Sequence, residues 1–299
     1  MNNVRGIFLI TLAMAGFAVE DMFVKLLSTP LSTGQILIGL GAGSALIFAA
    51  ISLINGENLF ARAAYTRITL LRAAAEAAAA AVFVLALTRA DLSTVAAIFQ
   101  ALPLAITMGG ALFLGDEVGW RRWSAITVGF LGVLLIIRPG LTGFEPASLL
   151  VLAAVVLVAA RDLLTRQIDS SVSSSVITSQ GFGSLVVAGL VILAFGNTPL
   201  VAMQGLEVAW LLGAILFGGA AYWCLVTAMR IGETPVVAPY RYTRLLFSMI
   251  LGILVFHERP DMPTIAGASL IILSGLYTFL RERKLAKPIA PAHPDFPAD

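Results

Sequence analysis

Residues 149–160 read LLVLAAVVLVAA, twelve apolar residues in a row, and they lie inside a largely apolar segment that runs from Pro146 to Thr165. A bilayer core about 30 Å thick requires roughly 20 such residues per helical crossing. Ser124–Ile137 is a second, nearly continuous apolar run. Strands of a membrane barrel would instead alternate apolar and polar side chains over about ten residues. These runs therefore predict membrane-spanning helices.

The composition agrees with a chain that has the lipid bilayer as its main solvent. Hydrophobic residues make up 59% of the 299 residues, charged residues only 12%, and the mean hydropathy is +0.95. A net charge of +2 is too small to indicate nucleic acid binding. Cys224 is the only cysteine, which excludes a disulfide framework or a thiolate metal site.

The sequence divides into ten apolar segments with short connections, so we expect an all-α integral membrane protein of ten transmembrane helices. The expected spans are Val4–Ser28, Thr33–Ile54, Ile68–Leu87, Leu92–Leu114, Trp123–Ile137, Pro146–Thr165, Val172–Phe195, Val208–Ala228, Pro235–Phe256 and Met262–Leu280.

Basic residues between the spans predict the orientation. A cytoplasmic amino terminus places twelve Lys and Arg residues on the cytoplasmic side and four on the other. Basic residues near helix ends are retained in the cytoplasm, so both termini should lie there, in a bacterial inner membrane. Residues 287–299, with four prolines, are expected to form a disordered cytoplasmic tail.

An internal repeat organises the chain. A constant shift of 141 residues aligns charged residues that are otherwise scarce, and it needs no gap: Asp21 with Asp162, Lys25 with Arg166, Arg89 with Arg230 and Glu117 with Glu258. This predicts two five-helix units, residues 4–137 and 146–280. Because five is odd, the second unit should be inverted in the membrane, an arrangement common among secondary transporters.

Several of these segments resemble a known family. EVGWRRW at residues 117–123, GFLGV at 129–133, APYRYTRLLF at 238–247, HERPD at 257–261 and GLY at 275–277 are similar to the two EamA repeats of the drug/metabolite transporter superfamily. The resemblance implies ten helices, a central substrate cavity and alternating access. The superfamily includes YddG-like exporters of aromatic amino acids and importers of nucleoside-like or vitamin metabolites. Many relatives carry an arginine early in the second helix, where this chain has Gln35.

Charged residues that obey the repeat lie near the ends of the expected helices. Such positions reach headgroups and water, so we interpret them as scaffold residues, with gating at the two membrane faces as the alternative. The set comprises Asp21, Asp162, Arg89, Arg230, Glu117 and Glu258.

Charged residues that break the repeat lie deeper. Glu76 aligns with Phe217, Arg244 with Pro103 and Arg241 with Gln100. A charge at the centre of a membrane helix costs roughly 2.5–3.5 kcal/mol to insert, so each should face a cavity or a partner. Two interpretations stay open: a substrate site, or a buried structural pair of Glu76 with Arg72 or with Arg244.

The fourth and ninth spans contain internal prolines, Pro103 and Pro239. Proline interrupts a helix, and paired interruptions in the two halves of a transporter indicate its binding site. The polar and aromatic residues that would share this region are Gln100, Thr107, Trp223, Tyr240 and Phe247.

The motifs leave a transporter as the favoured class. His257 and His293 are the only histidines, and no nucleophile elbow, phosphate-binding loop or paired metal ligands occur, so neither an enzyme nor a metal or cofactor site is expected. We therefore expect a secondary transporter of a small metabolite, with export of large amino acids as the main hypothesis. Uptake of a nucleoside-like or vitamin metabolite is the alternative, and a channel the alternative from another class. A monomer and a homodimer are both compatible with the sequence.

Overall fold

The computed structural model describes residues 3–169, 171–196, 200–232 and 234–285. Every regular element in these ranges is helical. The expected tail at 287–299 lies outside the described residues. In chain order the elements are α1 (Asn3–Leu27), α2 (Thr33–Ile54), η1 (Arg62–Tyr65), α3 (Arg67–Leu87), α4 (Leu92–Phe99), α5 (Leu102–Gly109), η2 (Gly110–Leu114), α6 (Trp120–Ile137), α7 (Ala147–Thr165), α8 (Ser174–Phe195), α9 (Gly205–Ile231), α10 (Thr234–Val237), η3 (Ala238–Tyr242), α11 (Thr243–Phe256) and α12 (Met262–Leu285).

Membrane-spanning helices are confirmed. Within the described ranges, nine segments are long and apolar enough to cross a bilayer, and the fourth of them, Leu92–Leu114, combines α4, α5 and η2. The ninth expected span, Pro235–Phe256, is not among these nine, and it is divided into α10, η3 and α11. The protein is therefore a multi-pass membrane protein, and a tenth crossing through the divided segment remains a prediction.

Local sequence signals at equivalent positions of the two repeats start equivalent helices. Ser32 precedes α2 and accepts a hydrogen bond from the backbone N–H of Gln35, while Ser173 precedes α8 and accepts one from Val176. A serine in this position satisfies one of the N–H groups that a helix start leaves free. The two caps are separated by the same 141 residues as the charged pairs.

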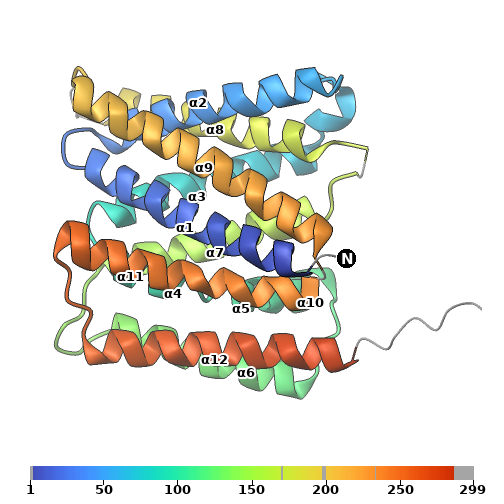
Figure 1. Cartoon of the computed structure of the whole chain (residues 1–299), viewed down its shortest axis with the longest axis vertical. Coiled ribbons are helices and arrows are strands. Elements are labelled where there is room, and N and C mark those ends of the chain that lie inside the picture. Colours follow the sequence, from blue (N-terminus) through green and yellow to red (C-terminus); the bar gives the residue numbers. More distant parts are fainter. Residues whose placement is uncertain (1–2, 170, 197–199, 233, 286–299) are drawn as a thin grey trace, which may run out of the picture.

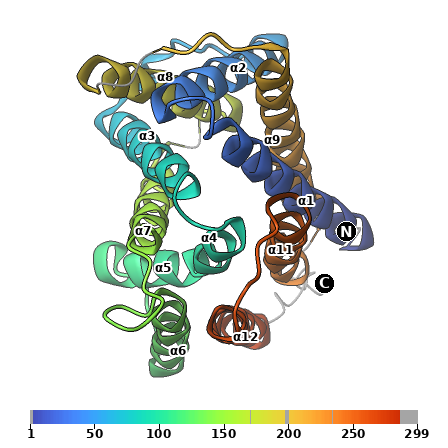
Figure 2. The same cartoon turned by 90° about the vertical axis from the view of Figure 1, so that its left-hand side faces the viewer.

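The helices pack in a two-fold pattern (Figures 1 and 2). α2 packs on α8 and α6 on α12, so each of these helices meets its own repeat equivalent, whereas α1 packs on α9 and α3 on α7. The last two contacts exchange with each other when the repeats are interchanged. This pattern places α1, α3, α7 and α11 around the middle of the bundle.

Small residues allow the closest helix contacts. Where α6 meets α12, a Cβ on Gly132 would come within 2.7 Å of the Gly267 carbonyl oxygen, and a Cβ on Gly267 within 2.5 Å of the Gly132 carbonyl oxygen. In a bilayer such close backbone packing replaces the hydrophobic effect as the force that joins helices. Gly41 of α2 lies equally close to the Phe182 carbonyl of α8.

The bundle has two ends that would face opposite sides of a membrane. We call the end at which α1 begins and α12 ends the terminal face, on the right in Figure 1, and the end at which α1 finishes the opposite face.

Candidate functional site

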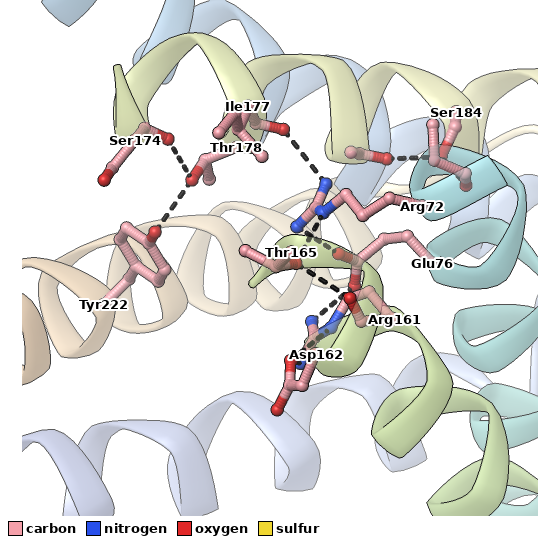
Figure 3. Close-up of polar contacts among 12 residues, drawn as sticks. Arg72, Glu76, Arg161, Asp162, Thr165, Ser174, Ile177, Thr178, Ser184 and Tyr222 are labelled. Atoms are coloured by element: carbon pink, nitrogen blue, oxygen red, sulfur yellow. Dashed lines mark hydrogen bonds and ion pairs between the residues drawn. The ribbon is translucent and has the colours of Figure 1, made fainter. Parts of the chain in front are cut away.

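An ion-pair network joins α3 to α7 in the interior of the bundle (Figure 3). The Glu76 carboxylate contacts Arg72 one turn away on α3 at 2.8 Å and Arg161 of α7 at 2.8 Å. Arg161 also contacts its neighbour Asp162 at 2.8 Å. The expected Glu76–Arg72 pair is therefore present. Arg161 is one of the twelve basic residues that the predicted orientation counts on the cytoplasmic side, and its side chain belongs to the interior network.

Arg72 fixes this network to the neighbouring helices. Its guanidinium donates to the Ile177 carbonyl on α8 at 3.0 Å and to the Thr165 hydroxyl on α7 at 3.4 Å. A side chain at Gly181 of α8 would meet the Arg72 guanidinium, so a larger residue there would force Arg72 to shift. Arg72 is thus a structural anchor with several partners, whereas Glu76 and Arg161 remain partly exposed.

A second interior pair joins α1 to α11. Arg244 contacts Asp21 at 2.6 Å, and its guanidinium lies over the rings of Phe17 and Phe99, 5.3 and 5.5 Å from their centroids. The alternative pairing of Arg244 with Glu76 is therefore wrong. Asp21 and Asp162 lie within the last two turns of α1 and α7, near helix ends as expected, but their side chains meet partners in the bundle: Asp21 is buried against Arg244, and Asp162 belongs to the Arg161 network. We call these six residues the interior charge cluster: Asp21, Arg72, Glu76, Arg161, Asp162 and Arg244.

Two further charged residues adjoin this cluster. Glu20 lies within electrostatic range of Asp21 and Arg244, and Arg241 within range of Asp162, Arg161 and Arg244. Glu20 was not singled out from the sequence. A signal was nevertheless present, because the shift of 141 aligns Glu20 with Arg161, a reversal of charge beside the repeated Asp21 and Asp162.

The fourth and ninth spans are interrupted, as their prolines predict. α4 ends at Phe99, and α5 resumes at Leu102 with Pro103 in its first turn. In the ninth span, Pro239 lies in the first turn of the 3-10 segment η3, which separates α10 from α11. The two breaks bring irregular backbone next to the interior charge cluster, since Arg241 lies within η3 and Phe99 contacts Arg244.

The other residues expected near the breaks have different surroundings. Gln100 is buried at the end of α4, and the Thr107 hydroxyl donates to the Pro103 carbonyl in its own helix. Tyr240 is exposed, and Phe247 packs against an apolar cluster formed by α1 and α9.

Trp223 is 61% exposed and does not face the cluster. Its neighbour Tyr222 does face the interior: the Tyr222 hydroxyl lies 2.8 Å from that of Thr178, and the ring packs edge-on against Phe48. Residues 222 and 223 point about 100° apart on a helix, which the aromatic pattern alone could not resolve.

At the opposite face, Glu258 joins the segment between α11 and α12 to the start of α4 and to α1. Its carboxylate accepts hydrogen bonds from the backbone N–H groups of Leu92 and Ser93 at 2.6 and 2.9 Å, and from the Ser93 hydroxyl at 2.7 Å. Lys25 of α1 contacts the same carboxylate at 3.2 Å and donates to the Ala90 carbonyl. We call this group the opposite-face latch. A carboxylate at a helix start is favoured by both the free N–H groups and the helix dipole.

The terminal face carries an equivalent pair that is far more open. Arg166, the repeat equivalent of Lys25, contacts Asp116 at 3.0 Å, and the two side chains are 52% and 47% exposed. The structural equivalent of Glu258 is therefore Asp116. Each follows a left-handed residue, Gly115 or His257, and each backbone N–H donates to the carbonyl of a glycine six residues earlier.

The expected equivalence of Glu117 and Glu258 is wrong by one position. Glu117 is exposed and its carboxylate has no role comparable to that of Glu258. The shift between the repeats is 142 in this region: the starts of the interrupted spans, Leu92 and Thr234, and their ends, Leu114 and Phe256, are also 142 residues apart. The remaining scaffold candidates are less informative: Arg89 is exposed, and the side chain of Arg230 lies outside the described residues.

Two clefts lie away from the interior charge cluster. An apolar groove of about 330 Å³ separates α5 and η2 from α7. A polar cleft of about 190 Å³ lies at the opposite face, where Arg138 pairs with Asp261. Among the described residues, no group of three or more His, Cys, Asp or Glu side chains could hold a metal ion.

The fold and the charged interior define a membrane transporter, and comparison with known proteins identifies its family. Residues 4–138 and 146–280 each match the EamA-like transporter family. The chain therefore belongs to the EamA-like transporter family. A solved crystal structure shares the fold with a TM-score of 0.60 at 17% identity, over 92% of this chain and 98% of that one.

Several relatives are named as carriers of S-adenosylmethionine or of riboflavin. The chain is 28% identical over 198 residues to the S-adenosylmethionine uptake transporter of Rickettsia prowazekii, covering 66% of each protein. It is 29% identical over 197 residues to the riboflavin transporter of Vibrio cholerae, covering 64% of this chain and 63% of that protein. The match to the riboflavin transporter of Brucella anthropi is 25% over 236 residues and covers 83% of that protein. The matched region thus spans slightly less than two thirds of the length of the Rickettsia prowazekii and Vibrio cholerae proteins.

Proposed function

We propose that this protein is an uptake carrier for a nucleoside-like or vitamin-type metabolite, which it moves across a bacterial inner membrane by alternating access. The observation that carries this proposal is the interior charge cluster, to which both repeats contribute. Asp21 of the first repeat meets Arg244 of the second, and Glu76 of the first meets Arg161 of the second. Charges at this depth of a membrane bundle are expensive and characteristically line substrate pathways.

Named relatives support uptake over our first hypothesis, the export of large amino acids. An S-adenosylmethionine carrier and riboflavin carriers both move a flat heteroaromatic ring joined to a hydroxylated chain or sugar. Channel function has no comparable support among these relatives. The two termini would lie in the cytoplasm, following the distribution of basic residues, and residues 4–137 and 146–280 would be the two units that move.

The two faces suggest how access alternates. The opposite-face latch is tightly bonded, whereas the Asp116–Arg166 pair on the terminal face is exposed. We interpret the structure as the state closed towards the opposite face. Uptake would require the Glu258 carboxylate to release α4, and formation of a tighter contact by Asp116 would close the terminal face in turn.

The test is transport by the purified protein in liposomes. Radiolabelled S-adenosylmethionine, riboflavin and tryptophan are supplied outside, with and without a pH gradient. We expect accumulation of S-adenosylmethionine or riboflavin to exceed that of tryptophan. Movement of tryptophan alone would contradict uptake of this substrate class and restore the amino-acid hypothesis. Reporter fusions at Thr142 and after Lys284 test the topology: a cytoplasmic signal at Thr142 would contradict an inverted repeat.

A further inference from the structure

Two charges of opposite sign lie next to the interior charge cluster without a partner in the part of the chain that the structure describes. Among the described residues, neither the Glu20 carboxylate nor the Arg241 guanidinium makes a hydrogen bond or an ion pair, although both lie within electrostatic range of Arg244. The six residues of the cluster itself are all paired. A charge held in a membrane bundle without a protein partner requires another source of stabilisation, and water or a substrate can supply it.

The helix that faces Glu20 leaves space for its carboxylate. Gly218 of α9 lies opposite, and a Cβ at that position would come within 2.6 Å of the Glu20 carboxylate. Any larger residue on α9 would push the carboxylate away. In the other repeat the equivalent of Glu20 is Arg161, which is fully engaged with Glu76 and Asp162. The Glu20 carboxylate therefore has no counterpart of the same charge in the other repeat and belongs to none of the ion pairs of the cluster.

Arg241 has a comparable position on the ninth span. It belongs to η3, the irregular segment between α10 and α11, and it is exposed although it lies within electrostatic range of Asp162, Arg161 and Arg244. Because Arg241 is exposed and the nearby charges belong to several helices, solvent reaches its guanidinium between those helices. Arg244, which lies one turn further along, is already neutralised by Asp21. The positive charge offered to a ligand is consequently that of Arg241.

We propose that Glu20 binds the positively charged centre of the substrate and that Arg241 binds its carboxylate. The ligand class is a nucleoside-like zwitterion with a permanent cation, such as a sulfonium. This inference rests on the proposed function and narrows it, because a neutral flavin offers neither charge. Two separated charges of opposite sign also exclude a simple organic anion or cation as the preferred ligand. Guanidinium suits the carboxylate because it donates two parallel hydrogen bonds.

The experiment compares a sulfonium with its uncharged thioether. S-adenosylmethionine and S-adenosylhomocysteine differ by one methyl group and one positive charge, and their binding to purified protein gives a preference ratio. In Glu20→Gln we expect this ratio to fall about tenfold or more, the effect of one charged interaction. Glu145→Gln removes the same charge from an exposed loop and should keep the native ratio. Glu20→Asp retains the charge and should retain a preference for the sulfonium.

Arg241 is tested separately with the methyl ester of the same sulfonium. Arg241→Gln should weaken binding of the free carboxylate about tenfold and leave binding of the ester unchanged. Native-like thermal denaturation of each variant in detergent establishes that it is folded. If Glu20→Gln does not fold, two other measurements test the inference. They are the preference of Glu20→Asp for the sulfonium over the thioether and the preference of Arg241→Gln for the free carboxylate over the ester.

The outcomes separate this inference from the proposed function. An unchanged sulfonium preference in a folded Glu20→Gln protein would overturn the inference, as would a Glu20→Gln protein that loses only its response to a pH gradient, since Glu20 would then carry a proton. Uptake of riboflavin without binding of either adenosyl compound would overturn the inference and preserve the vitamin form of the proposed function. Failure to take up any of these metabolites would overturn the proposed function itself.

Discussion

The two ends of the bundle are built from equivalent residues and differ in how tightly these residues close. At the opposite face Glu258 is almost completely buried, bonded to two backbone N–H groups and paired with Lys25. At the terminal face Asp116 and Arg166 form one exposed pair. Under the proposed alternating-access mechanism the two ends are alternatives to each other, and this difference would make the opposite face the closed end. The charges to test for a gating role are thus those that share an equivalent position and differ in their partners.

The largest effect should come from Glu258. In Glu258→Ala the N–H groups of Leu92 and Ser93 and the ammonium of Lys25 lose their common partner, which leaves the largely buried Lys25 charge with only the Ala90 carbonyl. Loss of one member of such a pair costs about 3–5 kcal/mol. We expect low folded yield and a reduced thermal denaturation temperature in detergent. Glu117→Ala is the matched control on the exposed end and should stay within about 0.5 kcal/mol of the native protein. Equal losses in both variants would contradict the assignment of Asp116 as the equivalent of Glu258.

A smaller difference is expected between the two cations. Lys25→Ala removes the ion pair but leaves the three hydrogen bonds of Glu258. We therefore expect the opposite-face latch to open more often but to remain formed in the folded protein. Arg166→Ala removes an exposed pair, which is worth about 0–1 kcal/mol. Hydrogen–deuterium exchange over residues 88–95 measures the latch directly, because the Leu92 and Ser93 amides belong to it. We expect faster exchange there in Lys25→Ala and native exchange in Arg166→Ala. The reverse order would show that the terminal face is the closed one.

Some features of the two ends could be predicted from the sequence and others could not. Apolar runs were sufficient to predict the nine spans found among the described residues, because helix formation in a bilayer depends on local composition. The prolines predicted the interruptions at α4–α5 and at η3. Glu258 and Glu117 could not be told apart, since the one-residue change of register between the repeats has no local signal. The Arg244–Asp21 pair joins residues 223 positions apart, and only the packing of α1 on α11 reveals it.

The smallest effect concerns Asp91, which stands at the start of α4 and does not cap it because Glu258 takes the N–H groups of Leu92 and Ser93. Burial raises the pKa of Asp91 above its ordinary value; the negative charge of Glu258 adds to the rise, and Lys25 opposes it. An acid with a raised pKa in the folded state destabilises that state once it is ionised. This penalty is absent below the ordinary range of aspartate, about pH 3.9, and is complete above the raised pKa.

Asp91→Asn should therefore raise the thermal denaturation temperature slightly at pH 7, and the gain should vanish near pH 3.5. Asp169 provides a control of opposite sign. Hydrogen bonds from Ser171 lower the pKa of this exposed carboxylate, so its ionised form favours the folded state at pH 7. Asp169→Asn should leave the protein unchanged or slightly less stable at that pH. If Asp91→Asn lowers stability at pH 7, its carboxylate supports the opposite-face latch, and the latch must then be extended to include a third charge beside Glu258 and Lys25.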